Sequence, residues 1–433
     1  MSQKITFVAT GDSFMTRRLP AEGYEGFAEL QTLIGKSDVR FNNLEFTVHD
    51  REGYPAAFSG GTWAMAEPVI LDDLNRFGFN LYNTANNHTG DYSHGGMLAT
   101  VRNLRERNIV FAGTGDDLKT ASRPAYLELP DARVALIAAC STFHDSDMAG
   151  NQGLSTVGRP GLNPLRSTKS FHVKKPYFET LKQIAAETDM NAEEDFEIAT
   201  GYQQPWPDGI FNFGGLTFVL DDKNEAHTEP KKRDMDRILA SVREAKRQSD
   251  CVLVSIHTHE FAGKSMENAA EFIETFAHAC IDEGAAAVLG HGPHILRGIE
   301  IYKGRPIFYS LGNFIFETDT VSLQPAEAYE NASMPPETEV GEYMNARSLN
   351  GTRGYAVMED IWRSVIAEFT EEDGKLTEIK LHPITLGMGE RRSRLGIPRL
   401  SREEATLRHL ARLSEPYGTK ITVKDGIGYI ELC

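Results

Sequence analysis

The fold is decided by one stretch of the chain, Val288-Leu-Gly-His-Gly-Pro-His-Ile-Leu-Arg-Gly-Ile-Glu-Ile-Tyr-Lys-Gly-Arg-Pro-Ile-Phe-Tyr-Ser-Leu-Gly-Asn-Phe314. It starts within a short apolar run, residues 285–289, which is typical of a buried strand. The run breaks at Gly290 into a tight polar segment that carries His291 and His294. The pattern therefore predicts two imidazoles at the end of a core strand, where rigid backbone would fix their direction for metal binding or acid–base work.

A β-hairpin is predicted immediately after these histidines. Two apolar runs, residues 297–302 and 306–311, are joined by three residues that include Gly304. Glycine supplies the backbone conformation that a tight hairpin turn requires. The returning strand then brings Asn313 back beside the histidines.

Composition limits the classes of function. The chain has 433 residues, enough for a large core or for two to three domains. Its 62 acidic residues outnumber 45 Lys and Arg, so the formal net charge is -17. A field of this sign repels nucleic acid and anionic membrane surfaces. We therefore expect no nucleic-acid partner and favour a small-molecule or peptide substrate, while the oligomeric state stays open.

The location of the chain is also suggested by its sequence. The first residues lead almost at once into a strand, without the basic and apolar regions of a signal peptide. The apolar runs at 134–140 and 251–256 are far shorter than the ~20 residues that span a bilayer. We therefore expect a cytoplasmic protein without a membrane span. The cysteines share no CxxC spacing and are expected to be reduced; they are Cys140, Cys251, Cys280 and Cys433.

Short strands alternate with amphipathic helices over residues 4–140 and again over 234–314, which indicates an α/β protein. Polar residues gather where successive strands end. These clusters are Gly11-Asp12 with Arg17, Asn42 to Glu45, Asn86-Asn87-His88, His257 to Glu260, and His291 with His294. Any one of them has an ordinary structural explanation, as a turn residue, a helix cap or a core histidine. Together they indicate a ligand site, because α/β proteins bind ligands at the carboxyl ends of their strands.

The order of these motifs resembles one known family. The chain carries Gly-Asp-x4-Arg, Asn-Leu-Glu, Ala-Asn-Asn-His, His-x-His-Glu, Gly-His-x-Pro-His and Tyr-Ser-Leu-Gly-Asn-Phe. This series looks like the capsule-synthesis CapA, or poly-γ-glutamate synthesis, family of the calcineurin-like metallophosphoesterase superfamily, and the resemblance covers about residues 4–316. It implies a four-layer α/β/β/α sandwich of metallophosphatase type.

The resemblance also implies a domain organisation. Residues 1–316 would form one domain of this fold, with inserted loops, and residues 141–230 would be an insertion over the site. Residues 317–350 are acidic and weakly periodic and are expected to form a loop or lid. Residues 351–433 would be a C-terminal β/α extension that packs on the same domain.

Site roles follow from the resemblance residue by residue. It implies metal ligands at Asp12, Glu45, Asn87, His257, His291 and His294, with His88 facing the substrate. The expected catalytic groups are Asp12, His88 and His294. Such oxygen and nitrogen ligands suit Mn²⁺, Zn²⁺ or Fe. Arg17 and Arg297 are expected to bind anionic oxygen, and Asn313 is assigned to substrate binding.

The chain departs from the superfamily pattern at several positions. Superfamily phosphoesterases usually begin with Asp-x-His, but Phe14 replaces that histidine here. Glu45 replaces the usual bridging aspartate, and Thr89 follows the Asn-His pair where an acid is usual. The sequence therefore leaves open two ions, a single ion or a metal-free site.

Three functions remain open at this point. The first is metal-dependent hydrolysis or transfer on a peptide, γ-glutamyl or phosphorylated substrate. The second is a metal-independent epimerase, in which Asp12 and His294 remove and return a proton at an amino-acid or peptide α-carbon. The third is a non-catalytic accessory protein that binds capsule polymer.

Overall fold

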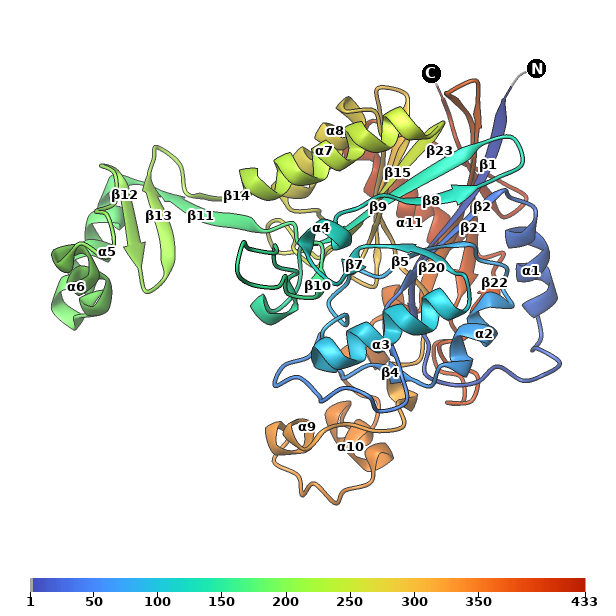
Figure 1. Ribbon diagram of the computed structural model, residues 1–433, viewed down its shortest axis with the longest axis horizontal. Coiled ribbons are helices and arrows are strands. Elements are labelled where there is room, and N and C mark those ends of the chain that lie inside the picture. The colour runs from blue at the N-terminus through green and yellow to red at the C-terminus, as the bar shows by residue number, and fades with distance from the viewer. Residues whose placement is uncertain (1–2, 433) are drawn as a thin grey trace.

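The computed structural model describes residues 3–432. Two large β-sheets form its body, and helices cover the outer face of each sheet (Figure 1). The larger sheet has ten strands in the order β23-β24-β21-β20-β1-β2-β5-β6, with β19 paired to β1 and β22 paired to β21. Its strands are β1 (Lys4–Phe14), β2 (Val39–Leu44), β5 (Leu81–Asn83), β6 (Val110–Ala112), β19 (Asn313–Phe316), β20 (Arg363–Glu372), β21 (Lys375–Thr385), β22 (Arg399–Leu400), β23 (Ile421–Lys424) and β24 (Ile427–Ile430).

The second sheet has six strands in the order β17-β18-β16-β15-β9-β8. Its strands are β8 (Ala125–Glu128), β9 (Arg133–Cys140), β15 (Cys251–His257), β16 (Ala287–His291), β17 (Leu296–Tyr302) and β18 (Arg305–Leu311). The hairpin predicted within residues 297–311 is confirmed by β17 and β18, which pair antiparallel.

The central strands of the second sheet, β9, β15 and β16, are buried on both faces, and their side chains alternate between two cores. In β9, Val134 and Leu136 point into the core between the two sheets, whereas Ala135 and Ile137 point into the core under the helices. Successive side chains of a strand leave on opposite faces, so a continuous apolar run fills both cores. This alternation stacks the two sheets directly on each other.

Helices complete the outer layers. The six-stranded sheet is covered by α7 (Lys232–Gln248) and α8 (Glu271–Asp282). In α7 the buried residues include Met235, Ile238 and Val242, the spacing of one helix face. The ten-stranded sheet is covered by α1 (Phe27–Gly35), α2 (Val69–Asn75) and α3 (Ser93–Glu106), whose apolar residues share a core with the outer face of β1. The result is four layers, α/β/β/α.

The C-terminal residues belong to the same body. Strands β20 to β24 extend the ten-stranded sheet, and α11 (Glu404–Ser414) packs against β17 and β23. The remaining elements of the body are β3 (Thr47–Val48), β4 (Met65–Ala66), β7 (Thr114–Gly115), β10 (Gly161–Leu162), α4 (Leu118–Ala121), α9 (Ala326–Asn331), α10 (Val340–Arg347), η1 (Asp145–Asp147), η2 (Thr318–Thr320), η3 (Gly354–Val357), η4 (Glu359–Trp362) and η5 (Glu415–Tyr417). Within residues 3–432, no helix combines the length and the apolar character needed to cross a bilayer.

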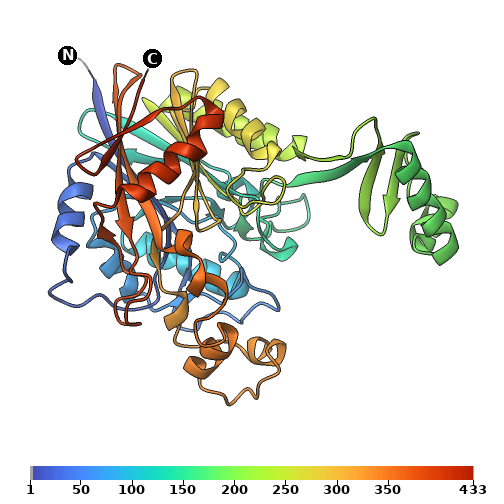
Figure 2. The same ribbon diagram turned by 180° about the vertical axis from the view of Figure 1, so that it is seen from behind.

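Most of the expected insertion does not lie over the site. Residues 167–230 form a separate four-stranded sheet of β11 (Ser167–Val173), β12 (Ile210–Phe213), β13 (Leu216–Leu220) and β14 (Glu225–Pro230), with α5 (Lys175–Thr188) and α6 (Ala192–Thr200). Figures 1 and 2 show this arm projecting from the body. The expectation fails because the segment pairs its strands with one another, and its contacts with the body run through β14 and α8.

The predicted loop or lid at 317–350 contains regular structure. Its helices α9 and α10 bury Tyr329 and Tyr343 in the core outside the ten-stranded sheet, with ring centroids 5.1 Å apart. The weak periodicity of the sequence concealed these anchors, because each helix has at most eight residues. Cys140, Cys251 and Cys280 are free and buried, as expected, and Cys433 lies outside the described residues.

Candidate active site

Parallel strand pairing brings the sequence motifs together. Asp12 lies near the carboxyl end of β1 and is in register with Asn43 of β2 and with Asn313 of β19. In the other sheet, His257 ends β15 in register with His291, which ends β16. Because the carboxyl ends of parallel strands meet at one edge of a sheet, residues hundreds of positions apart become neighbours.

Two glycines let the backbones approach closely enough for this meeting. A Cβ atom on Gly11 would lie 1.8 Å from the carbonyl oxygen of Gly312, so no larger residue fits there. Gly292 has a left-handed φ of 122°, and its N–H donates to Oδ2 of Asp12 at 3.0 Å. The bond from Gly292 joins the loop after β16 to the end of β1.

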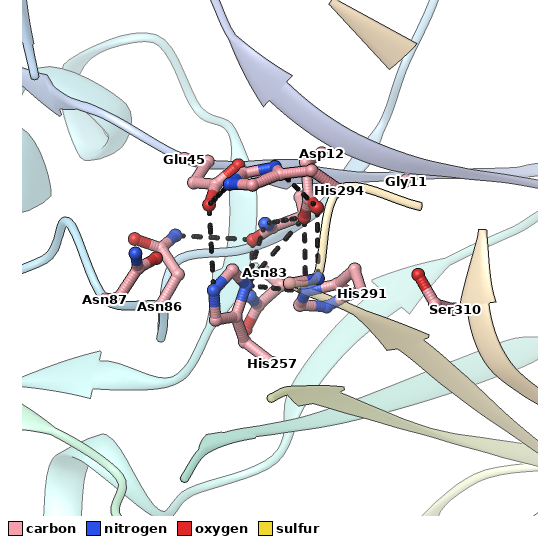
Figure 3. A network of polar contacts seen from close by, with 12 residues as sticks. Gly11, Asp12, Glu45, Asn83, Asn86, Asn87, His257, His291, His294 and Ser310 are labelled. Carbon is pink, nitrogen blue, oxygen red and sulfur yellow. Dashed lines mark hydrogen bonds and ion pairs between the residues drawn. The ribbon is translucent and has the colours of Figure 1, made fainter. Parts of the chain in front are cut away.

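Five predicted ligands converge in one buried cluster, shown in Figure 3. Asp12 lies 3.8 Å from Nδ1 of His257 and 3.6 Å from Nδ1 of both His291 and His294. Glu45 lies 3.6 Å from Nε2 of His257 and 3.8 Å from Nε2 of His294. Their ligand atoms form overlapping groups of three within 4.8 Å, which is close enough to share a metal ion.

Several oxygen atoms at this cluster have no hydrogen-bond partner within residues 3–432. Both carboxylate oxygens of Glu45 are buried without such a bond, and so is Oδ1 of Asn87. Burying unpaired acceptors of this kind is costly, so they indicate a group that the protein itself does not supply. A divalent cation fits, because it accepts carboxylate, amide and imidazole donors together. Figure 3 shows Asn87 on the Glu45 side of the cluster.

Burial dominates the electrostatics of the cluster. It raises the pKa of Asp12 to about 7, although hydrogen bonds from Asn43 and Gly292 oppose the shift. Burial, and then the negative charge of Asp12, raise the pKa of Glu45 well above its usual value. Burial lowers the pKa of His291 to about 3 and that of His294 to about 4. The imidazoles are therefore neutral at physiological pH, the form in which they bind metals.

His88 lies beside the cluster and is held in a fixed orientation. Its Nδ1 is 2.7 Å from Oδ2 of Asp91, and its ring packs edge-on against Phe14 with centroids 5.2 Å apart. Asp91 is itself fixed by the backbone N–H groups of Gly60 and Ala64. Asp91 therefore orients the imidazole ring. The sequence signal for this role was its position three residues after His88.

Asn313 is placed in the cluster, but in a different role from the one expected. Its Oδ1 is 2.9 Å from Nδ1 of His294, and its Nδ2 donates to the backbone oxygens of His294 and Ile361. These bonds hold His294 at a φ of 61°, a left-handed conformation that costs about 1–2 kcal/mol. Because its polar atoms are engaged and its side chain is buried, Asn313 positions His294 and does not contact substrate.

The two arginines expected to bind anionic oxygen are also engaged elsewhere. Arg297 is fully buried and donates to the backbone oxygens of Met266 and Glu260 at 2.8 and 2.9 Å. Arg17 forms an ion pair with Glu317 at 2.9 Å. Each guanidinium holds a neighbouring segment of the chain in place, but Nε of Arg17 and Nη1 of Arg297 have no hydrogen-bond partner within residues 3–432, so anion binding by these two residues stays a prediction.

His259 is a ligand candidate that the sequence reasoning missed. Its Nε2 lies 3.2 Å from Nε2 of His257, and it forms a further three-residue group with His257 and Glu45. The signal was the His-Thr-His spacing, which puts alternate residues on the same side of an extended chain. The nearby Glu260 is no such candidate, because its carboxylate accepts bonds from Ser141, Thr142 and Thr258.

Four stacked α/β/β/α layers with a ligand cluster at the strand ends are the arrangement that the family resemblance implied. Residues 6–318 match the family model described as "Bacterial capsule synthesis protein PGA_cap", so the chain belongs to this family.

Individual relatives agree with this assignment. The chain is 36% identical to "Uncharacterized protein y4sH" of Sinorhizobium fredii, over 99% of this chain and 93% of the relative. It is 25% identical to "Capsule biosynthesis protein CapA" of Bacillus anthracis, over 73% of this chain and 61% of the relative. A putative 5'-nucleotidase from Staphylococcus aureus, solved in complex with alpha-ketoglutarate, aligns with 12% identity and a TM-score of 0.33, over 71% of this chain and 48% of that one. This last likeness is too low to carry an argument.

Proposed function

We propose that this member of the capsule synthesis family is a metal-dependent hydrolase or transferase that acts on a peptide, γ-glutamyl or phosphorylated substrate. One observation carries the proposal: two buried carboxylates and four imidazoles converge where the oxygens of Glu45 accept no hydrogen bond from residues 3–432. Burying two carboxylates without a cation costs free energy, and a bound divalent ion removes that cost.

A bound Mn²⁺, Zn²⁺ or Fe ion would polarise a substrate oxygen and make water a better nucleophile. Asp12, Glu45, Asn87, His257, His291 and His294 would hold it. Asn313 would keep His294 aimed at the ion through the bond to Nδ1, and Asn43 and Gly292 would fix the carboxylate of Asp12.

His88 would deliver the proton to the leaving group. The carboxylate of Asp91 accepts a hydrogen bond from Nδ1–H of His88. Nε2 of His88 would then carry the proton that is transferred. The buried Asp91 carboxylate would also stabilise the protonated ring, as an orienting acid does in other hydrolases. Asp91 is thus a positioning residue and His88 the acid.

A metal-independent epimerase is the second candidate. It is favoured by Phe14 in place of the usual imidazole ligand and by the pKa of about 7 at Asp12, which suits proton transfer at neutral pH. Crowding around the second base opposes it. Nδ1 of His294 is engaged by Asn313, which leaves Nε2 as the base, and this atom lies 3.8 Å from the carboxylate of Glu45.

Elemental analysis of the purified full chain, combined with activity assays, tests the two candidates. The metal proposal expects a stoichiometric ion, loss of hydrolysis of p-nitrophenyl phosphate or γ-glutamyl-p-nitroanilide after EDTA treatment, and recovery with Mn²⁺ or Zn²⁺. His257→Ala should lose both ion and activity, while His278→Ala, a half-exposed histidine paired with Glu300, should lose neither.

Other outcomes would reject the metal proposal. Full activity in metal-free protein would exclude it. Entry of solvent deuterium at a substrate α-carbon, abolished by Asp12→Asn in metal-free protein, would establish the epimerase. Binding of polymer without any turnover would favour the non-catalytic accessory role.

A further inference from the structure

A small pocket lies next to the ligand cluster and is lined by residues between Thr318 and Ala356. Its volume is about 160 Å³, and its lining includes Thr318, Asp319, Met344, Arg347, Arg353 and Tyr355. A complete small-molecule site usually encloses a larger volume, about 300–1,000 Å³. The pocket therefore has the size for one functional group of a larger substrate.

Tyr355 is the wall that the pocket shares with the ligand cluster. Its ring centroid is 5.8 Å from the ring of His294 and 5.4 Å from that of Phe316. Burial raises the pKa of Tyr355, the nearby charge of Glu45 adds to the shift, and Arg347 opposes it. Tyr355 therefore packs against His294 of the ligand cluster and is close enough to Arg347 for that charge to affect its pKa.

The pocket carries two arginines without acidic partners. Arg353 donates from Nε to the backbone oxygen of Arg347 at 2.9 Å, and Arg347 donates from Nη1 to Oγ1 of Thr62. Neither guanidinium forms an ion pair with a carboxylate of residues 3–432. Asp319 is the acid in the lining, and burial raises its pKa while Arg392 and Arg347 oppose the shift. The charged residues that line the pocket are therefore two arginines and one acid.

From these observations we infer that the Arg347–Arg353 pocket is an anion subsite, which takes a carboxylate or phosphate group of the substrate at a point away from the reacting bond. The inference rests on the proposed function, because the substrate meant here is the substrate of that reaction. A guanidinium binds either anion through paired N–H donors, so the chemistry is the same for both groups. Arg17 and Arg297, the arginines that the sequence suggested, are committed to Glu317 and to backbone oxygens.

Titration of simple anions into the EDTA-treated full chain tests the subsite independently of metal chemistry. The probes are inorganic phosphate and glutarate, measured by calorimetry. We expect at least one of them to bind, and Arg353→Gln to weaken it about tenfold or more, the usual effect of losing a charged hydrogen-bonding pair. The probe that binds identifies phosphate or carboxylate as the preferred group.

Two control variants distinguish direct anion binding from a general loss of charge and from loop anchoring. Arg391→Gln removes the same charge from an exposed position that does not line the pocket, and it should leave binding unchanged. Thr62→Val breaks the contact with Arg347 but keeps both arginines. An equal loss in Thr62→Val and Arg347→Gln would assign the effect to loop anchoring and overturn the role of Arg347.

Three results would overturn the subsite as a whole. The first is the absence of binding by either probe at about 10 mM, beyond the weak end of specific recognition. The second is unchanged binding in Arg353→Gln. The third is loss of binding in His257→Ala but not in Arg353→Gln, which would place the anion in the ligand cluster. Failure of the metal proposal alone would leave the anion titration as it is.

Discussion

Metal binding should depend on pH through Asp12 and not through the histidines. Burial raises the pKa of Asp12 to about 7, so below that pH the empty site holds a proton that an entering ion must displace. The pKa values of His291 and His294 are lowered to about 3 and about 4, so these rings have no proton to lose near neutral pH. Affinity should therefore rise as the pH increases through about 7.

The magnitude follows from the fraction of Asp12 that is protonated. With a pKa of about 7, roughly nine tenths of the carboxyl is protonated at about pH 6 and roughly one tenth at about pH 8. The apparent dissociation constant should thus be at least about tenfold weaker at the lower pH, or about 1.4 kcal/mol. The pKa of Glu45 is raised too, so its proton makes the dependence steeper.

Calorimetric titration of Mn²⁺ or Zn²⁺ at several pH values measures this linkage. Buffers with different ionisation enthalpies report the number of protons released, which should be about one or more near pH 6, and the part due to Asp12 should decline above pH 7. Asp12→Asn keeps an oxygen ligand but has no proton to release, so its pH dependence should be reduced to the part due to Glu45. Equal affinity across this range in the unaltered chain, or an unchanged slope in Asp12→Asn, would refute the reasoning.

Three further predictions concern single side chains. His291→Ala should lower bound metal and activity in parallel by elemental analysis, because the ligand shell becomes incomplete; full metal content would remove it from the ligand set. Asn313→Ala should weaken metal affinity about 10–100-fold in a chelator competition, because His294 loses its orienting bond, and an unchanged affinity would contradict that role. Arg297→Met should lower the free energy of unfolding by about 2–4 kcal/mol in urea titrations, because buried backbone oxygens lose their donor. Arg243→Met, which removes an exposed ion pair with Glu283, should cost less, and equal costs would mean that Arg297 does not hold the loop.

Much of the site could be predicted from local sequence signals. Asp12 and His257 each follow a run with strand periodicity, and His291 and His294 lie where Gly290 and Gly292 interrupt another. Such signals are local because strand formation depends on neighbouring residues, and parallel strands bring their carboxyl ends to one edge. The sequence by itself therefore predicted the α/β architecture, the hairpin after β16 and five of the side chains that converge at the site.

Only the tertiary structure decided what each long polar side chain contacts. Arg17 reaches Glu317, 300 positions along the chain, and Arg297 reaches the loop that follows β15. Arg347 and Arg353 lie in a segment without clear periodicity, yet the fold brings them beside the site. A guanidinium can donate to a carboxylate, to backbone oxygens or to a ligand. Which of these it contacts depends on which distant groups the packed chain places within hydrogen-bonding distance. For this reason the residue types at the site could be read from the sequence, whereas their division into ligands, positioning residues and anion-binding groups depended on contacts made across the whole fold.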